Sequence, residues 1–471
     1  MKIADLEIKG ITSNSKEVKR SFLFVAIKGN RQNGYSFIKE AISRGAIIVV
    51  VEKSARQIKA AGKIVFLVVN DCRKFFAQAT NEFYGAPSNK IKVVGITGTN
   101  GKTTISYLIE AMAKKSGYNS GVIGTINYRF KGKVIIAKNT TPGAGQLQGL
   151  LKKMYLQKVK YCAIEVSSHA LDQERVAGIN FSHAIFTNLT QDHLDYHKNL
   201  ENYFLAKAKL FRALPLTAKA IINHDDRYSH RIKRLTRSRI LTYGLKNKSM
   251  VMAKDINFGM QSTEFTLVAA GINIRIKTKL VGRYNIYNIL AAASWGISEK
   301  LPILDIKSAI EQFKNVPGRL QRVNCAKGFN IFVDYAHTPD ALFNVISALR
   351  PLVKGKIIVI FGCGGERDKL KRPQMGRVVT ELADYAIITS DNPRSENPSQ
   401  IIKDIQQGMQ KSNYCLVPER YQAIRKGLSL INKQDCLLIA GKGHENYQIL
   451  KNKVLKFSDR KVVKECLGLM K

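Results

Sequence analysis

Residues 93–104 read VVGITGTNGKTT, an apolar run followed by a segment of glycine, threonine and one lysine. In such a loop the glycines let backbone N–H groups point inward, Lys102 brings a positive charge to the β and γ phosphates of a nucleotide, and Thr103 offers a hydroxyl group to Mg²⁺. A helix that starts there adds the positive end of its dipole. The spacing departs from G-x-x-x-x-G-K-[ST], because Gly95 precedes Gly101 by six residues. We expect a phosphate-binding loop; an incidental Gly/Thr turn is the alternative.

Short apolar runs recur along the chain and are separated by helical segments. This alternation is typical of α/β proteins with parallel, doubly wound sheets. The runs that we expect to be strands are residues 22–27, 47–51 and 64–69, with Lys-rich helical stretches between them, then 93–96, 161–166, 184–187 and 220–222, and finally 331–333, 357–361, 386–389 and 436–439.

Polar motifs follow these runs almost every time. Ligands of doubly wound sheets bind beyond the carboxyl ends of the strands, so motifs in these positions predict an enzyme with a composite site. The motifs are TGTNGKTT (97–104), EVSSHALDQER (165–175), NLTQDHLDYH (188–197), DYAHTPD (334–340), GCGGERD (362–368), SDNPRSENP (390–398) and GKGHENYQ (441–448).

The length of 471 residues is too great for one core and indicates two to four domains. We expect three: a small N-terminal α/β domain over 1–87, a central phosphate-loop domain with a doubly wound sheet over 88–315, and a Rossmann-like C-terminal domain over 316–471. The Pro317-Gly318 turn lies close to the second boundary.

The composition is that of a globular protein with an unusual charge. Hydrophobic residues make up 45% of the chain and the formal net charge is +41. A basic surface attracts polyanions, but the lysines are spread along the chain and the one dense basic patch is 227–239, so a solvated basic surface competes with a nucleic-acid site. The apolar runs are far shorter than the roughly 18 residues of a membrane span. Seven cysteines without a CxxC pair fit a reducing cytoplasm.

Four further residues are candidates for chemistry, each with a plainer interpretation. Glu165 ends a strand, where an acidic metal ligand could meet Thr103; it could equally be a cap or a surface charge. His193 and His197 have the spacing of a zinc pair, but the glutamate and helical context of a zinc protease are missing. By composition alone, Lys207 is a solvated helix lysine.

Taken in order, the motifs resemble the Mur ligase family, and within it the ligases that add the third amino acid to UDP-N-acetylmuramoyl-L-alanyl-D-glutamate. The resemblance runs from about residue 10 to 450. It rests on TGTNGKTT, EVSSHALDQERV, NLTQDHLDYH with YFLAKAKLF, INHDD, GRYNIYNILAA, VPGRLQRV, VDYAHTPDAL, GCGGERDKLKRPQMG, DNPRSENP and GKGHENYQ.

The resemblance implies an ATP-dependent, amide-forming ligase of peptidoglycan synthesis that works through an acyl phosphate with Mg²⁺. The catalytic residues would be Lys102, Glu165, His193 and Lys207, and the metal ligands Thr103, Glu165, His193 and a carbamylated Lys207, since an ammonium group cannot bind a metal. The ATP-binding residues would be Gly98, Thr99, Asn100, Gly101, Lys102, Thr103, Thr104, Asn288, Arg319, Asp334 and His337.

For the UDP-muramoyl dipeptide, the resemblance implies uridine binding by the N-terminal domain. Two departures affect the uridine contacts: Asn14-Ser15-Lys16 stands where the family has Asp-Ser-Arg, and Asn33 replaces an aspartate. The implied binding residues are Ser15, Asn139, Thr140, Thr141, Ser167, Gln173 and Arg175.

The amino acid to be added would be meso-diaminopimelate, bound by the C-terminal domain. This substrate has a second amino-acid head, so a selective pocket needs a partner for one extra carboxylate and one extra ammonium group. Arg394 in DNPR has a planar fork that suits a carboxylate, and Glu445 can bind the ammonium. The expected residues are Arg367, Asp391, Asn392, Arg394, Gly441 and Glu445.

Other interpretations remain at this point. A lysine-adding or folate-polyglutamylating ligase would use the same ATP chemistry, although DNPR and EVSSHALDQER disfavour both. The charge suggests a nucleic-acid-stimulated ATPase, which lacks support from helicase motifs. A non-catalytic binding module would not need Lys102, Glu165, His193 and Lys207 together. We expect small-molecule substrates, no nucleic-acid or membrane partner, and a monomer.

Overall fold

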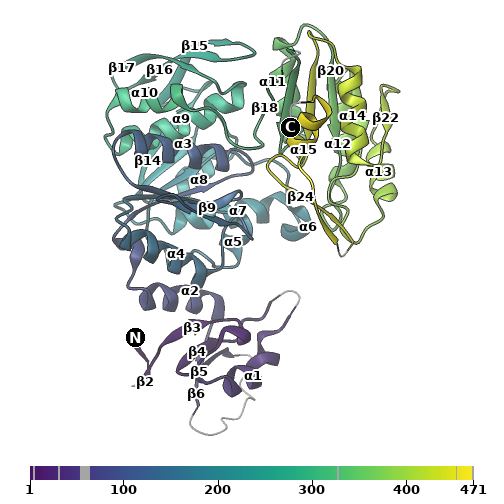
Figure 1. Cartoon of the computed structure of the whole chain (residues 1–471). Helices are drawn as coiled ribbons and strands as arrows, with labels where there is room; N and C mark the ends of the chain where they lie inside the picture. Colours follow the sequence, from purple (N-terminus) through teal and green to yellow (C-terminus); the bar gives the residue numbers. More distant parts are fainter. Residues whose placement is uncertain (4–5, 30–31, 54–63, 326–327, 452, 469–471) are drawn as a thin grey trace.

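Three large sheets follow one another along the chain in the computed structural model, which describes residues 1–3, 6–29, 32–53, 64–325, 328–451 and 453–468. Two further sheets have two strands each: β1 (Lys2–Ile3) with β2 (Leu6–Glu7), and a C-terminal hairpin. The N-terminal sheet lies at one end of the molecule, and the central and C-terminal sheets lie next to each other (Figure 1). This arrangement agrees with the expected α/β class. The domain boundaries expected after residues 87 and 315 stay predictions.

The N-terminal sheet has four parallel strands in the order β3 (Gly10–Thr12), β4 (Phe22–Val25), β5 (Ala46–Glu52) and β6 (Val65–Val69). Helix α1 (Ile38–Ser43) packs on one face and α2 (Cys72–Phe83) on the other. Phe76 of α2 also packs with Ala144 of helix α4, so α2 connects this sheet with the central part. The Lys-rich stretch expected between the last two strands falls largely on 54–63, outside the described residues.

The central sheet has eleven strands in the order β10-β9-β8-β11-β7-β12-β13-β14-β15-β16-β17. The seven from β8 to β15 are parallel, whereas β9 and β10 on one side and β16 and β17 on the other are antiparallel. Their bounds are β7 Lys92–Thr97, β8 Ser120–Ile123, β9 Asn127–Phe130, β10 Lys133–Ile136, β11 Tyr161–Glu165, β12 Phe181–Phe186, β13 Lys219–Asn223, β14 Arg239–Gly244, β15 Val251–Phe258, β16 Thr263–Ala269 and β17 Ile272–Thr278.

Helices cover both faces of this sheet because its parallel strands are apolar on both sides. Strand β11 sends Ala163 to one face and Cys162 and Ile164 to the other. The first face carries α3 (Lys102–Lys115), α9 (Arg283–Ser298) and α10 (Ile303–Gln312). The second carries α4 (Ala144–Leu156), α5 (Ser168–Asp172), α7 (Leu200–Arg212) and α8 (Ser229–Leu235); the short α6 (Leu194–His197) precedes α7.

The C-terminal sheet has the order β18-β19-β23-β20-β21-β22, and all but β18 are parallel. The strands are β18 Gln321–Arg322, β19 Asn330–Asp334, β20 Ile357–Phe361, β21 Tyr385–Ile388, β22 Tyr414–Leu416 and β23 Cys436–Ala440. Helices α11 (Pro339–Leu349), α12 (Lys371–Leu382) and α13 (Pro398–Gln406) cover one face, and α14 (Arg420–Leu430) and α15 (Asp459–Cys466) the other. A hairpin of β24 (Tyr447–Leu450) and β25 (Lys453–Lys456) follows the sheet.

All eleven expected strands are present, with ends shifted by a few residues. The expectation of parallel sheets alone was incomplete, because the central sheet is extended by antiparallel strands. These strands are short, or have one buried and one more exposed face. In β16 every second residue is buried, from Thr263 to Ala269, so the strand has no continuous apolar run that would predict it.

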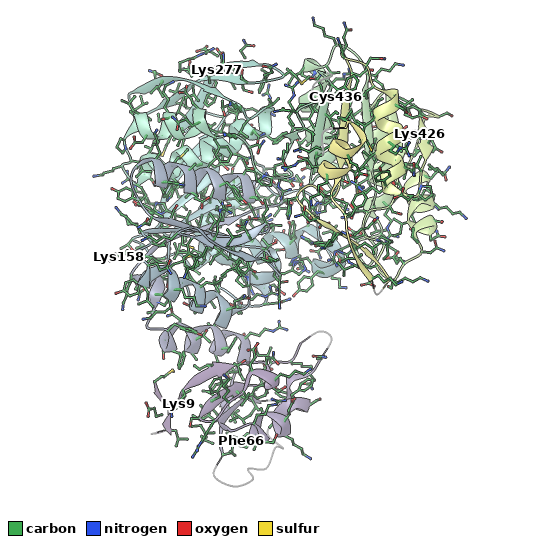
Figure 2. All side chains as sticks on the ribbon, in the orientation of Figure 1. Lys9, Phe66, Lys158, Lys277, Lys426 and Cys436 are labelled. Atoms are coloured by element: carbon green, nitrogen blue, oxygen red, sulfur yellow. The ribbon has the colours of Figure 1, made fainter. Side chains whose placement is uncertain are left out.

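Lysine side chains project from all three parts of the molecule, as Lys9, Lys158, Lys277 and Lys426 illustrate (Figure 2). The positive charge is therefore distributed over the surface. Within the described residues, no helix combines the length and hydrophobicity that a membrane crossing requires.

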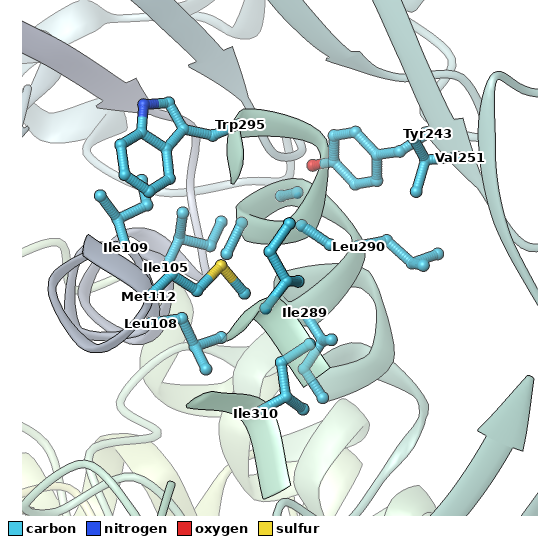
Figure 3. Packing of buried hydrophobic residues seen from close by; sticks show 14 of the residues in the cluster. Ile105, Leu108, Ile109, Met112, Tyr243, Val251, Ile289, Leu290, Trp295 and Ile310 are labelled. Atoms are coloured by element: carbon cyan, nitrogen blue, oxygen red, sulfur yellow. The ribbon is translucent and has the colours of Figure 1, made fainter. Parts of the chain in front are cut away.

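The only tryptophan of the chain, Trp295, is fully buried where α9 packs on α3, close to Ile109 and Met112 (Figure 3). Ile109→Ala should leave a cavity there and lower the free energy of unfolding of the central part by about 2–5 kcal/mol. The measurement is the urea midpoint of the red shift in Trp295 emission. Lys114→Ala, on the exposed side of the same helix, is the control and should move the midpoint little. Equal midpoints for both variants would contradict this packing.

Candidate active site

The loop between β7 and α3 is shaped by two glycines that no other residue could replace without movement. Gly98 has φ +144° and Gly101 has φ +91°. A Cβ atom at residue 98 would lie 1.8 Å from the Thr187 hydroxyl, and one at residue 101 would lie 2.4 Å from Oδ1 of Asn288. The loop therefore rests tightly on the segment after β12 and on helix α9.

Lys102 begins α3 and folds back over this loop. Its Nζ donates hydrogen bonds to the carbonyl oxygens of Gly98 at 2.8 Å and Thr99 at 2.7 Å. Burial lowers the pKa of Lys102, an effect that Glu165 and Asp192 oppose. The amine lies at the helix start, where a nucleotide phosphate would be attracted by both the helix dipole and the lysine.

Glu165 lies beside the phosphate loop because β11 pairs directly with β7, with Glu165 opposite Ile96. The Thr103 hydroxyl donates to the Glu165 carboxylate at 3.0 Å, and both side chains are buried. Thr125 holds the same carboxylate through its N–H group at 3.1 Å and its hydroxyl at 2.8 Å. The structure thus brings the two predicted metal ligands Thr103 and Glu165 into contact.

The C-terminal part reaches the same loop through two hydrogen bonds. Arg319 donates to the Thr103 hydroxyl at 3.1 Å, and Asn100 donates to the Asp340 carboxylate at 2.7 Å. Arg319 also stacks over Tyr335, with 4.5 Å between the guanidinium carbon and the ring centre. The loop is therefore shared between the central and C-terminal sheets.

The other residues that we expect to bind ATP lie where the phosphate loop contacts the C-terminal part. Asn288 is buried beside Gly101. Asp334 ends β19 and accepts hydrogen bonds from the backbone N–H groups of Leu320 and Ala336. Nδ1 of His337 donates to the Tyr335 carbonyl at 2.7 Å, and burial lowers the pKa of His337 to about 4. Burial raises the pKa of Asp334, and Arg319 opposes that shift.

His193 lies in a group of aromatic and acidic side chains after β12. Its backbone is left-handed, with φ +55°, directly before α6. Its ring meets that of His169 edge to face, with 4.8 Å between centroids, and its Nε2 lies 3.4 Å from Oδ2 of Asp192. Burial lowers the pKa of His193, and Asp192 opposes the shift. The imidazole is therefore neutral at neutral pH, which leaves a ring nitrogen free to act as a ligand.

Lys207 is buried on α7, which contradicts the interpretation as a solvated lysine. Its Nζ donates to the Gly98 carbonyl at 2.9 Å and lies 4.3 Å from the centre of the Tyr203 ring. Burial, followed by the charge of Lys102, holds the pKa of Lys207 well below its usual value. Lys102 and Lys207 thus converge on one carbonyl of the phosphate loop.

Most residues expected at the muramoyl dipeptide form a network attached to Glu165. The Thr141 hydroxyl donates to the Glu165 carbonyl at 2.7 Å, and the Ser167 N–H group donates to the Thr141 hydroxyl at 3.0 Å. Arg175 donates to the Thr141 carbonyl at 3.0 Å and to the Gln173 amide oxygen at 2.6 Å. Beside them, Thr140 hydrogen-bonds Thr125 and the Asn139 carbonyl accepts from Tyr128.

Ser15 lies apart from this network, in the N-terminal domain. Its hydroxyl donates to the Glu40 carboxylate at 2.7 Å, and Asn14 caps the same turn. Asn33 likewise caps a turn, by accepting from the N–H group of Tyr35. These three residues stabilise local turns, and the structure does not bring them to the phosphate loop.

The residues expected at the added amino acid meet at the carboxyl ends of β20, β21 and β23. Arg394 has φ +54°, and its NH1 donates to the carbonyls of Gly365 at 2.7 Å and Asn392 at 3.3 Å. None of the ion pairs between described residues uses this guanidinium. The fork is therefore held in place while part of it stays available for an anion.

Glu445 supplies the opposite charge. Oε2 of Glu445 accepts from the Asn392 amide at 2.8 Å, and burial, then Asp391, raises its pKa. Gly441 has φ +111°, and a Cβ atom there would lie 2.6 Å from Oδ2 of Asp391. Arg367 is exposed, and among the described residues its guanidinium donates to the Glu366 carbonyl within the same loop.

Three family models match the chain: the Mur ligase family, catalytic domain, over residues 7–84, the Mur ligase middle domain over 96–296, and the Mur ligase, glutamate ligase domain, over 318–443. A UDP-N-acetylmuramoyl-L-alanyl-D-glutamate–2,6-diaminopimelate ligase of Clostridium botulinum is 42% identical over 463 residues, 98% of this chain and 95% of the relative.

The chain belongs to the Mur ligase family.

Two further comparisons place this Mur ligase within the family. A protein of the same name from Aquifex aeolicus is 43% identical over 462 residues, 98% of this chain and 94% of the relative. The solved structure of another such ligase has a TM-score of 0.70 and 30% identity, and covers 98% of this chain and 95% of that one. The resemblance expected from the motifs is confirmed.

Sequence reasoning missed several side chains of this Mur ligase site. Thr125 holds Glu165, Asp340 holds Asn100, and Asp192 lies between His193 and the loop. Lys371, at the start of α12, is buried and close enough to Asp192 to lower the pKa of that carboxyl. The only sequence signals were that Asp192 and Asp340 belong to motifs already recognised, DH and DYAHTPD, whereas Thr125 gave none.

Replacing Gly98 by alanine tests the loop. The new Cβ would overlap the Thr187 hydroxyl and displace the carbonyl that Lys102 and Lys207 share. A displacement of about 1 Å in a catalytic site can lower the reaction rate about 100-fold. We expect a loss of about the same size in ATP affinity, measured by calorimetry. Gly132→Ala is the control, because Gly132 also has positive φ but has open space around it. ATP binding by Gly98→Ala at wild-type strength would refute the fit.

Proposed function

We propose that the chain is an ATP-dependent acid–amino-acid ligase that joins meso-diaminopimelate to the D-glutamate carboxyl of UDP-N-acetylmuramoyl-L-alanyl-D-glutamate, a step of peptidoglycan precursor synthesis. The relatives above carry names of this activity. One observation carries the choice of amino acid: Arg394 and Glu445, of opposite charge, both hydrogen-bond Asn392 at one end of the C-terminal sheet. Such a pair suits the second amino-acid head of diaminopimelate.

The reaction requires activation of a poor electrophile. A carboxylate oxygen of the dipeptide bonds to the γ-phosphorus of ATP, the bond from that phosphorus to the bridging oxygen breaks, and ADP leaves. The amine then bonds to the carbonyl carbon of the acyl phosphate, loses a proton, and expels inorganic phosphate to leave an amide. Both substrates of the first step are anions, so their approach in a dry site is strongly unfavourable without cations.

The residues around the phosphate loop can supply these cations. We assign Lys102 and Arg319 to the phosphates, because one begins α3 and the other reaches Thr103 from the C-terminal part. We assign Asn288, which lies beside Gly101, to the adenine, and Asp334 and His337, which lie close to Arg319, to the ribose and phosphates. The network from Thr141 to Arg175 is assigned to the dipeptide, since it is anchored on Glu165.

The site also fits Mg²⁺. The Thr103 hydroxyl and the Glu165 carboxylate are buried oxygen donors in contact with each other, and Mg²⁺ prefers oxygen ligands, taking one or two carboxylates together with phosphates. No group of three or more His, Cys, Asp or Glu among the described residues is arranged to hold a metal alone. Thr103 and Glu165 would hold the Mg²⁺ that neutralises phosphate charge when bound, and Glu165 and His193, together with a carbamylated Lys207, would hold a second Mg²⁺.

Carbamylation of Lys207 is a further part of the proposal. A neutral amine is the form that attacks CO₂, and burial beside Lys102 favours the neutral form of Lys207. The nitrogen of the neutral amine bonds to the carbon of CO₂, one C–O π bond of CO₂ opens, and the nitrogen loses one proton, so a neutral amine becomes a carbamate anion. That anion would be stabilised by Lys102 and could serve as a metal ligand with Glu165 and His193.

The competing functions receive less support. A lysine-adding ligase has no distal carboxylate to bind and would leave Arg394 without a partner. A nucleic-acid partner would favour a concentrated basic surface, whereas lysines project from all parts of this molecule (Figure 2). We therefore propose small-molecule substrates, a monomer, and a cytoplasmic location that suits the free cysteines.

The proposal is tested by supplying the purified protein with ATP, Mg²⁺ and UDP-muramoyl dipeptide together with one amino acid at a time. Phosphate release with diaminopimelate should exceed that with lysine by about 10⁴-fold, since lysine leaves buried polar groups unpaired. Arg394→Ala should raise the KM for diaminopimelate about 100-fold and leave the KM for ATP unchanged. Arg377→Ala, an exposed arginine of α12, is the control. Equal use of lysine and diaminopimelate by the wild type would reject the assignment.

Lys207→Ala should abolish turnover, because the variant cannot form the carbamate. Acetate or formate should restore part of the activity by supplying a carboxylate to the same space. Intact-protein mass spectrometry of the wild type in bicarbonate should detect the added CO₂. Lys209→Ala removes an exposed lysine of the same helix that pairs with Glu174, and it should keep full activity and need no rescue. Full activity of Lys207→Ala without a carboxylate would disprove the role.

A further inference from the structure

The amino-acid pocket is backed by a buried lysine that the reaction above does not use. Lys442 follows β23 and stands between Gly441 and Gly443, both with positive φ. A Cβ atom at residue 443 would lie 2.7 Å from Cβ of Tyr335, so the turn is pressed against the segment after β19. The Lys442 side chain is fully buried as a result.

The contacts of Lys442 lead directly to Glu445 and Asn392. Its Nζ donates to Oδ1 of Asn392 at 3.0 Å and lies 3.4 Å from Oε2 of Glu445. The amide of Asn392 donates to the same Oε2 at 2.8 Å, and its Oδ1 also accepts from the N–H group of Ile449. Within the described part of the chain, both protein donors to Glu445 use Oε2, and none uses Oε1.

A second buried ion pair supports the same turn. Arg420 of α14 binds Asp459 through two hydrogen bonds of 2.7 and 2.8 Å, and both side chains are buried. The guanidinium also donates to the carbonyl of Ala440 at 2.9 Å, directly before the turn, and to that of Ser390 at 3.3 Å. Arg420 therefore links the segment before Lys442 to the segment before Asn392, which fixes the position of Lys442 relative to the loop of Asn392.

We propose that Lys442 is a positioning residue for amino-acid selection: it holds Oε2 of Glu445 from the buried side, keeps that carboxyl ionised, and leaves Oε1 to receive the distal ammonium group of the incoming amino acid. The inference rests on the proposed function. It assigns the selection of the ammonium head to a pair, Glu445 and Lys442, and the selection of the carboxylate head to Arg394.

Electrostatics explain why a cation is needed there. Burial is the largest influence on Glu445 and favours its neutral form, and the negative charge of Asp391 acts in the same direction. Lys442 and the Asn392 hydrogen bond oppose both. The other titratable groups that face Glu445 are Arg420, Tyr335 and Tyr447. Lys442 is the cation in direct contact with the carboxylate, so its removal should raise the pKa of Glu445 further.

The decisive variant is Lys442→Met, which keeps a long apolar chain and removes the charge. At pH 7 a larger share of Glu445 would then carry a proton and lose its attraction for the ammonium group. The KM for diaminopimelate should rise about 10- to 100-fold, while kcat and the KM for ATP stay within about threefold of the wild type. Because the pKa of Glu445 rises, the KM should fall again with increasing pH, and the acidic limb of the profile should move to higher pH.

Three comparisons make the result specific. Lys442→Arg restores the charge and should recover part of the affinity, and Lys456→Met, an exposed lysine of β25, should match the wild type. Glu445→Gln should raise the KM for diaminopimelate, and this KM should lose the pH dependence that comes from titration of Glu445. If Lys442→Met does not fold, as judged by its melting temperature, Asp391→Asn tests the same electrostatics: it removes the opposing anion, so the acidic limb should move to lower pH.

Two outcomes would overturn the inference. One is a folded Lys442→Met with an unchanged KM for diaminopimelate at pH 7. The other is an equal loss for all three substrates without a shifted profile, which would indicate a structural role only. Failure of the proposed function gives a different result, because the wild type itself would then not turn over diaminopimelate.

Discussion

The strongest constraint on this molecule is the repulsion between the anions that its reaction must bring together. The answer in the structure is a pair of cationic side chains at the carboxyl end of β7, where Lys102 donates to the carbonyl of Gly98 and Arg319 reaches Thr103. Two buried or partly buried carboxylates, Glu165 and Asp192, balance them. Glycines make the arrangement possible, since any side chain at residue 98 would fill the space that the loop needs.

The same loop joins two sheets that are far apart in the sequence. Asn100 and Thr103 each hydrogen-bond a residue that follows the central domain, Asp340 and Arg319. Contacts of this kind connect the proposed nucleotide site with the C-terminal part, to which we assign the amino-acid pocket. Chemistry that needs three substrates in one place depends on such a junction.

The amino-acid pocket uses buried charges in a different way. Buried ion pairs contribute little net stability on average, because desolvation offsets their attraction, and specificity is the better reason to keep them. In this protein Arg420 with Asp459 is fully buried, and Lys442 is buried behind the carboxylate of Glu445, which we propose as the ligand of the substrate ammonium group. They orient Glu445 and the Asn392 loop before any ligand arrives, so less ordering is required on binding.

The sequence by itself determined the fold class, eleven of the strands, the phosphate loop and the family, because these follow from local patterns: apolar runs, strand–loop–helix order and motifs of fixed spacing. It also named Thr103, Glu165, Arg394 and Glu445, whose motifs lie at strand ends. Only the tertiary structure decided which groups touch. Thr125 on Glu165, Asp340 on Asn100 and the burial of Lys207 and Lys442 depend on strand order and on the docking of separate sheets. Such contacts join residues far apart in the chain, and no local spacing encodes them.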